Sequence, residues 1–168
     1  MRRGLAVAAV LAQPTAARLT SRFTTRFGAS APIVLAPMGG CAGGALAAAV
    51  SAAGGIGLVG SGGESLDFLK HEWAIAQAFP GVERSRLGFG LNVKQLEEYP
   101  DGTLESTLQE LQPAHVYLSF GDIAPHASTI LASGAALYSN AGDCEGALAH
   151  ARAGATCVVM QGSDAGGH

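Results

Sequence analysis

The chain has 168 residues, 48% of them hydrophobic, and a formal net charge of −3. This balance predicts a globular domain with a sizeable core, and the lack of a basic stretch argues against nucleic acid or an anionic membrane surface as a partner. The three cysteines, Cys41, Cys144 and Cys157, are odd in number and lack metal-type spacing. We therefore expect small, buried or half-buried residues in a reducing, intracellular compartment and no metal site.

Charge is unevenly distributed at the start of the chain. The first acidic residue is Glu64, whereas five arginines precede it, at Arg2, Arg3, Arg18, Arg22 and Arg26. An acid-free start with arginine and hydroxyl residues resembles a mitochondrial or plastid transit peptide. A secretory signal, with the apolar run 4–12 after two arginines, and a disordered extension are the alternatives. Transit peptide or extension is favoured over secretion, because an odd cysteine count does not suit an exported protein.

The uncharged stretch 33–60 has the length of a membrane span, but Pro37 and eight glycines interrupt it. It divides better into a strand over 33–36, a loop, a helix over 44–53 and a strand over 56–59. The same alternation continues along the chain. Strands are predicted over 87–91, 115–119, 135–139 and 156–160, and helices over 64–79, 103–111, 123–132 and 144–153.

This repeat of about 20 to 30 residues predicts βα units in a parallel α/β sheet, either doubly wound or closed as a barrel. A polar or glycine residue follows every predicted strand, which favours a (β/α)8 barrel because its site is built from all the carboxyl-terminal strand ends. The pattern G-x-G-x-x-G at 55–60 is interpreted as coincidental. A dinucleotide fingerprint joins a strand to the helix that it opens, whereas a helix precedes these glycines.

Four stretches together resemble the nitronate monooxygenase (2-nitropropane dioxygenase) family, whose relatives include the flavin-type enoyl-acyl-carrier-protein reductases. They are 32–40 (PIVLAPMGG), 46–57 (LAAAVSAAGGIG), 90–93 (GLNV) and 161–168 (QGSDAGGH). The resemblance implies an FMN-dependent TIM barrel. It assigns residues 19–168 to the amino-terminal portion of that barrel and leaves residues 1–18 as the extension.

The resemblance also implies cofactor contacts. Pro37, Met38 and Gly39 would lie against the flavin ring with their backbone, and glycine permits that close approach. The side-chain amides of Asn92 and Gln161 would meet the polar edge of the ring, because an amide both donates and accepts hydrogen bonds. Gly166 and Gly167 would bring backbone amides near the ribityl or phosphate part of FMN.

The reaction implied is oxidation of alkyl nitronates, or related carbanions, by molecular oxygen. Several family members carry a histidine at the end of the fifth strand as a base, and counting places Ser139 there in this chain. The catalytic base is therefore unknown, with His168 as a weak candidate. A substrate that is already ionised, such as a nitronate, would need no base.

Only six strands are predicted, whereas eight close a TIM barrel. We therefore expect a truncated chain that binds FMN poorly or not at all when expressed alone. Two alternative functions remain open: an incomplete barrel or pseudo-enzyme without flavin turnover, and an NAD(P)H-dependent flavin reductase. The true substrate and the oligomeric state are not predicted.

Overall fold

The computed structural model describes residues 19–61 and 63–162. The proposed extension, residues 1–18, lies outside them. Five strands form one sheet in which every neighbouring pair is parallel. The strands are β1 (Gly57–Gly60), β2 (Leu87–Asn92), β3 (His115–Ser119), β4 (Ala136–Ala141) and β5 (Cys157–Met160).

The helices predicted from the sequence are present, with ends that differ from the prediction by at most two residues. They are α2 (Gly44–Ala52), α3 (Leu66–Ala78), α5 (Thr103–Leu111), α6 (Ala124–Ala132) and α7 (Cys144–Arg152). Three short elements were not predicted: α1 (Arg22–Phe27), the 3-10 helix η1 (Arg84–Arg86) and α4 (Val93–Leu96). The predicted first strand, 33–36, is reduced to a single parallel bridge between Val34 and Ile56.

The order of the strands distinguishes a barrel from a doubly wound sheet. The sheet runs β1-β2-β3-β4-β5, and the Val34 bridge adds the first segment beside β1. Neighbours in sequence are thus neighbours in space throughout, whereas a doubly wound sheet reverses its order at a switch point. The described residues form part of a (β/α)8 barrel fold, as predicted.

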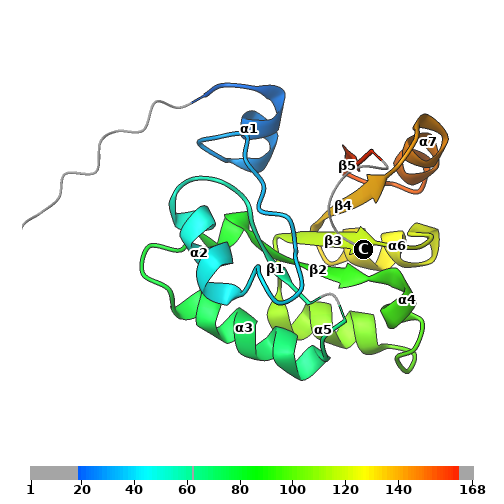
Figure 1. Ribbon diagram of the computed structural model, residues 1–168, viewed down its shortest axis with the longest axis horizontal. Helices are drawn as coiled ribbons and strands as arrows, with labels where there is room; N and C mark the ends of the chain where they lie inside the picture. The colour runs from blue at the N-terminus through cyan, green and yellow to red at the C-terminus, as the bar shows by residue number, and fades with distance from the viewer. Residues whose placement is uncertain (1–18, 62, 163–168) are drawn as a thin grey trace, which may run out of the picture.

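The two faces of the sheet bury different side chains. The outer face packs Val59, Phe89 and Leu118 against the helices, in a cluster that includes Leu69 and Trp73 of α3. The inner face carries Leu58, Tyr117 and Tyr138, which alternate with outer residues along each strand. Figure 1 shows α1 on the opposite side of the sheet from α3 and α5.

Helix α1 covers part of the inner face. Ser21 and Thr24 form a capping box at its start, and Gly28 ends it in the left-handed conformation with φ 64°. Phe23 and Phe27, one turn apart on the helix, pack against the inner cluster. Part of the arginine-containing start of the chain therefore belongs to the folded domain.

The glycines at 55–60 serve packing between elements. A Cβ on Gly57 would overlap the backbone of Ala47, so glycine allows α2 to approach β1 closely. Gly57 and Gly60 lie within β1 itself. This placement agrees with the interpretation that the dinucleotide pattern is coincidental, because no helix begins where the pattern ends.

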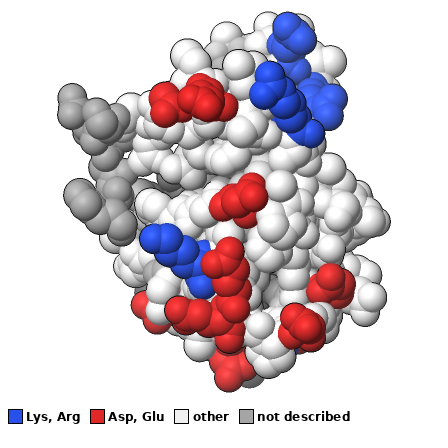
Figure 2. Space-filling view, turned by 90° about the vertical axis from the view of Figure 1, so that its right-hand side faces the viewer, with Lys and Arg blue, Asp and Glu red and all other residues white. Residues whose placement is uncertain are grey.

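Three further expectations concern the charged surface, membrane-spanning helices and the cysteines. The face drawn in Figure 2 carries basic and acidic side chains in separate small groups rather than in one continuous basic stripe. Among the described helices, none combines the length and apolar composition that a membrane crossing requires. The expectation of buried or half-buried cysteines is wrong for Cys41, which is exposed on a loop, and for Cys144, which is exposed at the start of α7. It is confirmed for Cys157, which is half-buried.

Candidate functional site

Four polar side chains gather at the carboxyl-terminal edge of the sheet, on its inner face. Asn92 ends β2 and pairs in register with Ser119 at the end of β3. Asn140 lies two residues after the inner-facing Tyr138 on β4, and Gln161 follows β5. Parallel strands bring their carboxyl ends to the same edge, and in (β/α) barrels this edge carries the active site.

The loop after the first segment lies across this edge. A Cβ on Gly90 would overlap the ring of Pro37, and one on Gly60 would overlap the backbone of Met38. The two glycines, paired in register on β1 and β2, thus let the chain cross directly over the inner face. Met38 is 45% exposed there and Gly39 is exposed. The structure therefore presents Pro37, Met38 and Gly39 as an accessible shelf, which we call the 37–39 shelf.

Asn92 is held by the helix that follows it. Its Oδ1 accepts a hydrogen bond of 3.0 Å from the backbone N–H of Lys94, which caps the start of α4. No other described residue accepts from the amide nitrogen of Asn92. At this edge the side chain is thus arranged to act as a donor.

Gln161 is tied to β4 by two hydrogen bonds. Its backbone N–H donates to the carbonyl of Ala141 at 2.9 Å, and its Oε1 accepts from Nδ2 of Asn140 at 3.0 Å. Both side chains are half-buried. The structure thus brings Gln161 and Asn92 to one edge as predicted and adds Asn140, which the sequence indicated only as a polar residue after a strand.

Ser139 lies on the other face of the sheet. It alternates with the inner-facing Tyr138 and Asn140 and pairs in register with the outer-facing Leu118. The side chain is fully buried, and its Oγ has no hydrogen-bond partner among the described residues. The position at the end of β4 that faces the site is therefore held by Asn140 rather than by Ser139.

Phe120 is a feature of this edge that the sequence did not reveal. It follows β3 directly, is 45% exposed, and adopts a left-handed backbone with φ 60°. Such a conformation is uncommon for a bulky residue and tends to occur at functional sites. The motif Ser119-Phe120-Gly121 after a strand was the available signal.

Three predicted site residues, Gly166, Gly167 and His168, lie outside the described residues. Within residues 19–61 and 63–162, no cluster of three or more His, Cys, Asp or Glu side chains is placed to hold a metal ion. The start of α2 is also occupied, because the backbone N–H of Gly44 donates to Oε2 of Glu72 at 2.6 Å. A carboxylate therefore already lies at that helix start.

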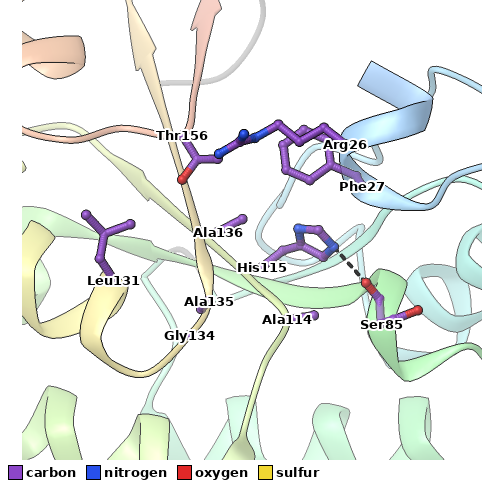
Figure 3. A pocket seen from close by; sticks show the side chains of 10 residues that line it. All are labelled: Arg26, Phe27, Ser85, Ala114, His115, Leu131, Gly134, Ala135, Ala136 and Thr156. Carbon is purple, nitrogen blue, oxygen red and sulfur yellow. Dashed lines mark hydrogen bonds between the residues drawn. The ribbon is translucent and has the colours of Figure 1, made fainter. Parts of the chain in front are cut away.

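The amino-terminal edge of the sheet carries a hollow of about 560 Å³. Its lining residues lie on α1, on η1, near the end of α6, and at or just before the starts of strands. Figure 3 shows Arg26 extending across the hollow toward Thr156. His115 forms its floor, with Nε2 3.0 Å from the carbonyl of Ser85 and Nδ1 3.2 Å from the hydroxyl of Tyr138. A carbonyl only accepts, so Nε2 carries the proton and Tyr138 donates to Nδ1.

Burial shifts the pKa values of this cluster toward the neutral forms. It lowers the pKa of His115 below the ordinary 6.5, against the raising effect of the Ser85 carbonyl. It raises the pKa of Tyr117 to about 12 and that of Tyr138 further. The three groups are thus uncharged at neutral pH, as a packed aromatic cluster requires, and none is poised for proton transfer there.

The fold and the polar carboxyl-terminal edge define a (β/α)8-barrel protein with a site built from successive strand ends. Comparison of the sequence with known families matches residues 20–119 to nitronate monooxygenase. A nitronate monooxygenase of Pseudomonas aeruginosa is 36% identical, over 89% of this chain and 52% of that protein. The chain belongs to the nitronate monooxygenase family, and it spans about half the length of this curated relative.

Solved structures agree with the fold. FabK of Thermotoga maritima superposes with a TM-score of 0.76 and 24% identity, over 89% of this chain and 46% of that one. A nitroalkane oxidase of Streptomyces ansochromogenes superposes with a TM-score of 0.70 and 28% identity, over 88% of this chain and 50% of that one. The family relation inferred from the sequence motifs is confirmed, and FabK shares the fold.

Proposed function

We propose that this chain supplies the flavin-contacting edge of an FMN-dependent oxidoreductase that oxidises alkyl nitronates with molecular oxygen. The observation that carries the proposal is the 37–39 shelf, which lies against Gly60 of β1 and Gly90 of β2, at the same carboxyl-terminal edge of the sheet as the amides of Asn92 and Gln161. Family membership supports the reaction class, and the contacts below support the cofactor.

The residues fit a flavin by shape. A flat ring system needs backbone that approaches closely over an area without side chains, and Gly60 and Gly90 create the space for the 37–39 shelf. A Cβ on Gly40, directly after the shelf, would meet no atom of the described residues within 4 Å. Bound flavin would accept electrons from the substrate carbanion and pass them to oxygen.

The residues also bear on the substrate. Asn140 holds the inner-facing position at the end of β4, and an amide cannot remove a proton at physiological pH. This favours a substrate that arrives already ionised, such as a nitronate, over a neutral nitroalkane. The exposed side chains of Met38 and Phe120 offer apolar surface for its alkyl group.

The proposal is tested by a chimera that joins residues 19–162 to the carboxyl-terminal half of the Pseudomonas aeruginosa relative. We expect bound FMN that propane-2-nitronate reduces rapidly in anaerobic stopped-flow experiments, while neutral 2-nitropropane reduces it far more slowly. The intact relative is the positive control. A chimera that folds but retains no flavin would contradict the proposal.

An NAD(P)H-dependent flavin reductase is the second candidate, because the sequence motifs also relate the chain to the flavin-type enoyl-acyl-carrier-protein reductases. The same chimera separates the two, because a nicotinamide nucleotide rather than the nitronate would then reduce the flavin. For the 168-residue chain alone, we expect weak FMN binding, with a Kd from about 0.1 to 1 mM. A tight, stoichiometric flavoprotein would contradict that expectation.

A further inference from the structure

Phe120 is an apolar ring left exposed at the carboxyl-terminal edge of the sheet. On β3, Tyr117 belongs to the inner cluster and Leu118 to the outer one. Regular alternation would therefore place Phe120, two residues after Leu118, on the outer face beneath the helices. Instead it packs against neither cluster and remains 45% exposed. The ring therefore contributes little to the packing of the domain.

The backbone of Phe120 is also unfavourable for its side chain. Its φ of 60° lies in the left-handed region, which glycine adopts without strain and a bulky residue rarely does. Among the described residues, Gln112 is the other non-glycine residue with a positive φ, and it ends α5, where such a conformation is common. A phenylalanine that is strained and poorly packed stabilises nothing in the fold, and such residues cluster at functional sites.

The residues on either side of Phe120 fix its loop to the neighbouring strand. Before it, Oγ of Ser119 donates to the carbonyl of Leu91 on β2 at 3.4 Å. After it, a Cβ on Gly121 would lie 2.6 Å from Cγ1 of Val93, so glycine allows the loop to pack directly against the start of α4. The conformation of Phe120 is therefore held between two anchored residues.

These two anchors place Phe120 next to the proposed flavin site. They contact Leu91 and Val93, which are the chain neighbours of Asn92, and Asn92 itself pairs in register with Ser119. The ring thus lies beside one of the amides that we propose to contact FMN. A substrate that approaches the flavin at this edge would meet an apolar surface here.

We propose that Phe120 is a specificity-determining residue, which contacts the alkyl group of the nitronate and makes the site prefer longer alkyl chains. The inference rests on the proposed function. Each methylene group that leaves water for an apolar surface favours binding by up to about 4-fold. Because the backbone around Phe120 is anchored, this surface is in place before the substrate arrives.

The chimera with the carboxyl-terminal half of the Pseudomonas aeruginosa relative tests this role by anaerobic stopped-flow reduction of its flavin. We expect butane-1-nitronate to have a Kd at least about 10-fold below that of methanenitronate. Phe120→Ala should lower this preference about 5-fold or more, while FMN affinity and the reduction rate with methanenitronate change less than about 2-fold. Phe120→Leu should retain part of the preference.

Leu148→Ala is the matched control, because it removes an apolar side chain that is 56% exposed on α7, away from this edge. It should leave the preference unchanged. A preference for butane-1-nitronate that is the same in the unaltered and Phe120→Ala chimeras would overturn the inference, although the proposed function would still stand.

Saturation-transfer NMR on the same chimera gives a readout that does not depend on flavin reduction. We expect the alkyl protons of butane-1-nitronate to receive saturation from the protein, and Phe120→Ala to reduce it by at least about half. A chimera without flavin that still shows this Phe120-dependent transfer would contradict the proposed function alone. Transfer that does not respond to Phe120→Ala would contradict the inference.

The stability of Phe120→Gly separates a ligand contact from a structural role. Glycine adopts the left-handed conformation without strain, so we expect the midpoint of chemical denaturation to stay unchanged or to rise. The preference for butane-1-nitronate should nevertheless be lost, as in Phe120→Ala. A marked fall in the midpoint would show that the ring is retained for packing, and the specificity role would then be wrong.

Discussion

The two edges of the sheet are built from contrasting residues. At the amino-terminal edge, the rings of Phe27, His115 and Tyr138 pack with centroid distances of 5.5 to 5.6 Å. At the carboxyl-terminal edge, glycines, amides and an exposed loop take their place. The amino-terminal edge is thus a packed aromatic cluster. The carboxyl-terminal edge instead presents backbone and amide groups, which we propose contact a ligand.

The same alternation of side chains produces both edges. Tyr138 is fully buried and Asn140, two residues later on the same face, is half-buried. Side chains two residues apart on a strand share a face. On β4 the first of these two inner-facing side chains thus belongs to the packed cluster, and the second belongs to the polar edge. Variants at the two edges should accordingly separate stability from ligand binding.

The largest expected effect comes from the amino-terminal edge. Tyr138→Ala removes a fully buried ring that contacts Phe27, Tyr117 and His115. We expect the free energy of unfolding to fall by about 3–5 kcal/mol, measured by chemical denaturation. Tyr138→Phe keeps the ring and loses only the hydroxyl bond to His115, so it should cost about 1 kcal/mol. Equal losses in the two variants would argue against ring packing as the source of stability.

Gly60→Ala tests whether the shelf needs glycine beneath it. The added Cβ would overlap the backbone of Met38, so we expect a loss of about 1–3 kcal/mol in unfolding free energy together with weaker FMN binding. Gly142→Ala is the matched control at the same edge, because its Cβ would meet only the carbonyl of Gln161 at 3.8 Å. A Gly60→Ala chain with unaltered FMN affinity would contradict the assignment of the shelf.

His115 should make stability depend on pH. Burial lowers its pKa below the unfolded value of 6.5, although the hydrogen bond to the Ser85 carbonyl opposes this shift. The unfolded chain therefore binds the proton at higher pH than the folded chain does. Stability is fully present above about pH 6.5 and declines as the pH falls from there toward the folded pKa. Denaturation at several pH values should show this slope, and His115→Gln should remove it.

Ser139→Ala should have the smallest effect. Its buried Oγ has no partner among the described residues, so removing it relieves an unpaired polar atom. We expect unfolding free energy unchanged or raised by up to about 1 kcal/mol. Ser51→Ala is the contrasting control, because that equally buried hydroxyl donates to the Glu83 carbonyl at 2.8 Å and should cost about 1–3 kcal/mol. A large loss for Ser139→Ala would reveal a partner and a different role.

Much of the fold could be predicted because its strands are continuous apolar runs followed by glycine or polar residues. The strand 115–119 and the helix 103–111 were predicted to the residue. Helix α1 was not predicted, although Ser21, Thr24 and Gly28 carry the capping signals that define it. Short helices depend on such local bonds more than on hydrophobic periodicity.

The site could be predicted only in part. The motifs placed Asn92 and Gln161 at strand ends, and the structure brings both to one edge. The face of Ser139 could not be settled by counting, because an offset of one residue moves a side chain to the other side of a sheet. The partner of Gln161 was also beyond the sequence, since Asn140 lies 21 residues away and meets it only through strand pairing.

The most direct test of the flavin site is a backbone 15N–1H NMR titration with FMN of the chimera that joins residues 19–162 to the carboxyl-terminal half of the Pseudomonas aeruginosa relative. The account predicts that resonances of Met38, Gly39, Asn92 and Gln161 move together with a single affinity, while those of His115 and Phe27 stay in place. Shifts that cluster around the hollow lined by His115 and Phe27, or no shifts at the carboxyl-terminal edge, would contradict it.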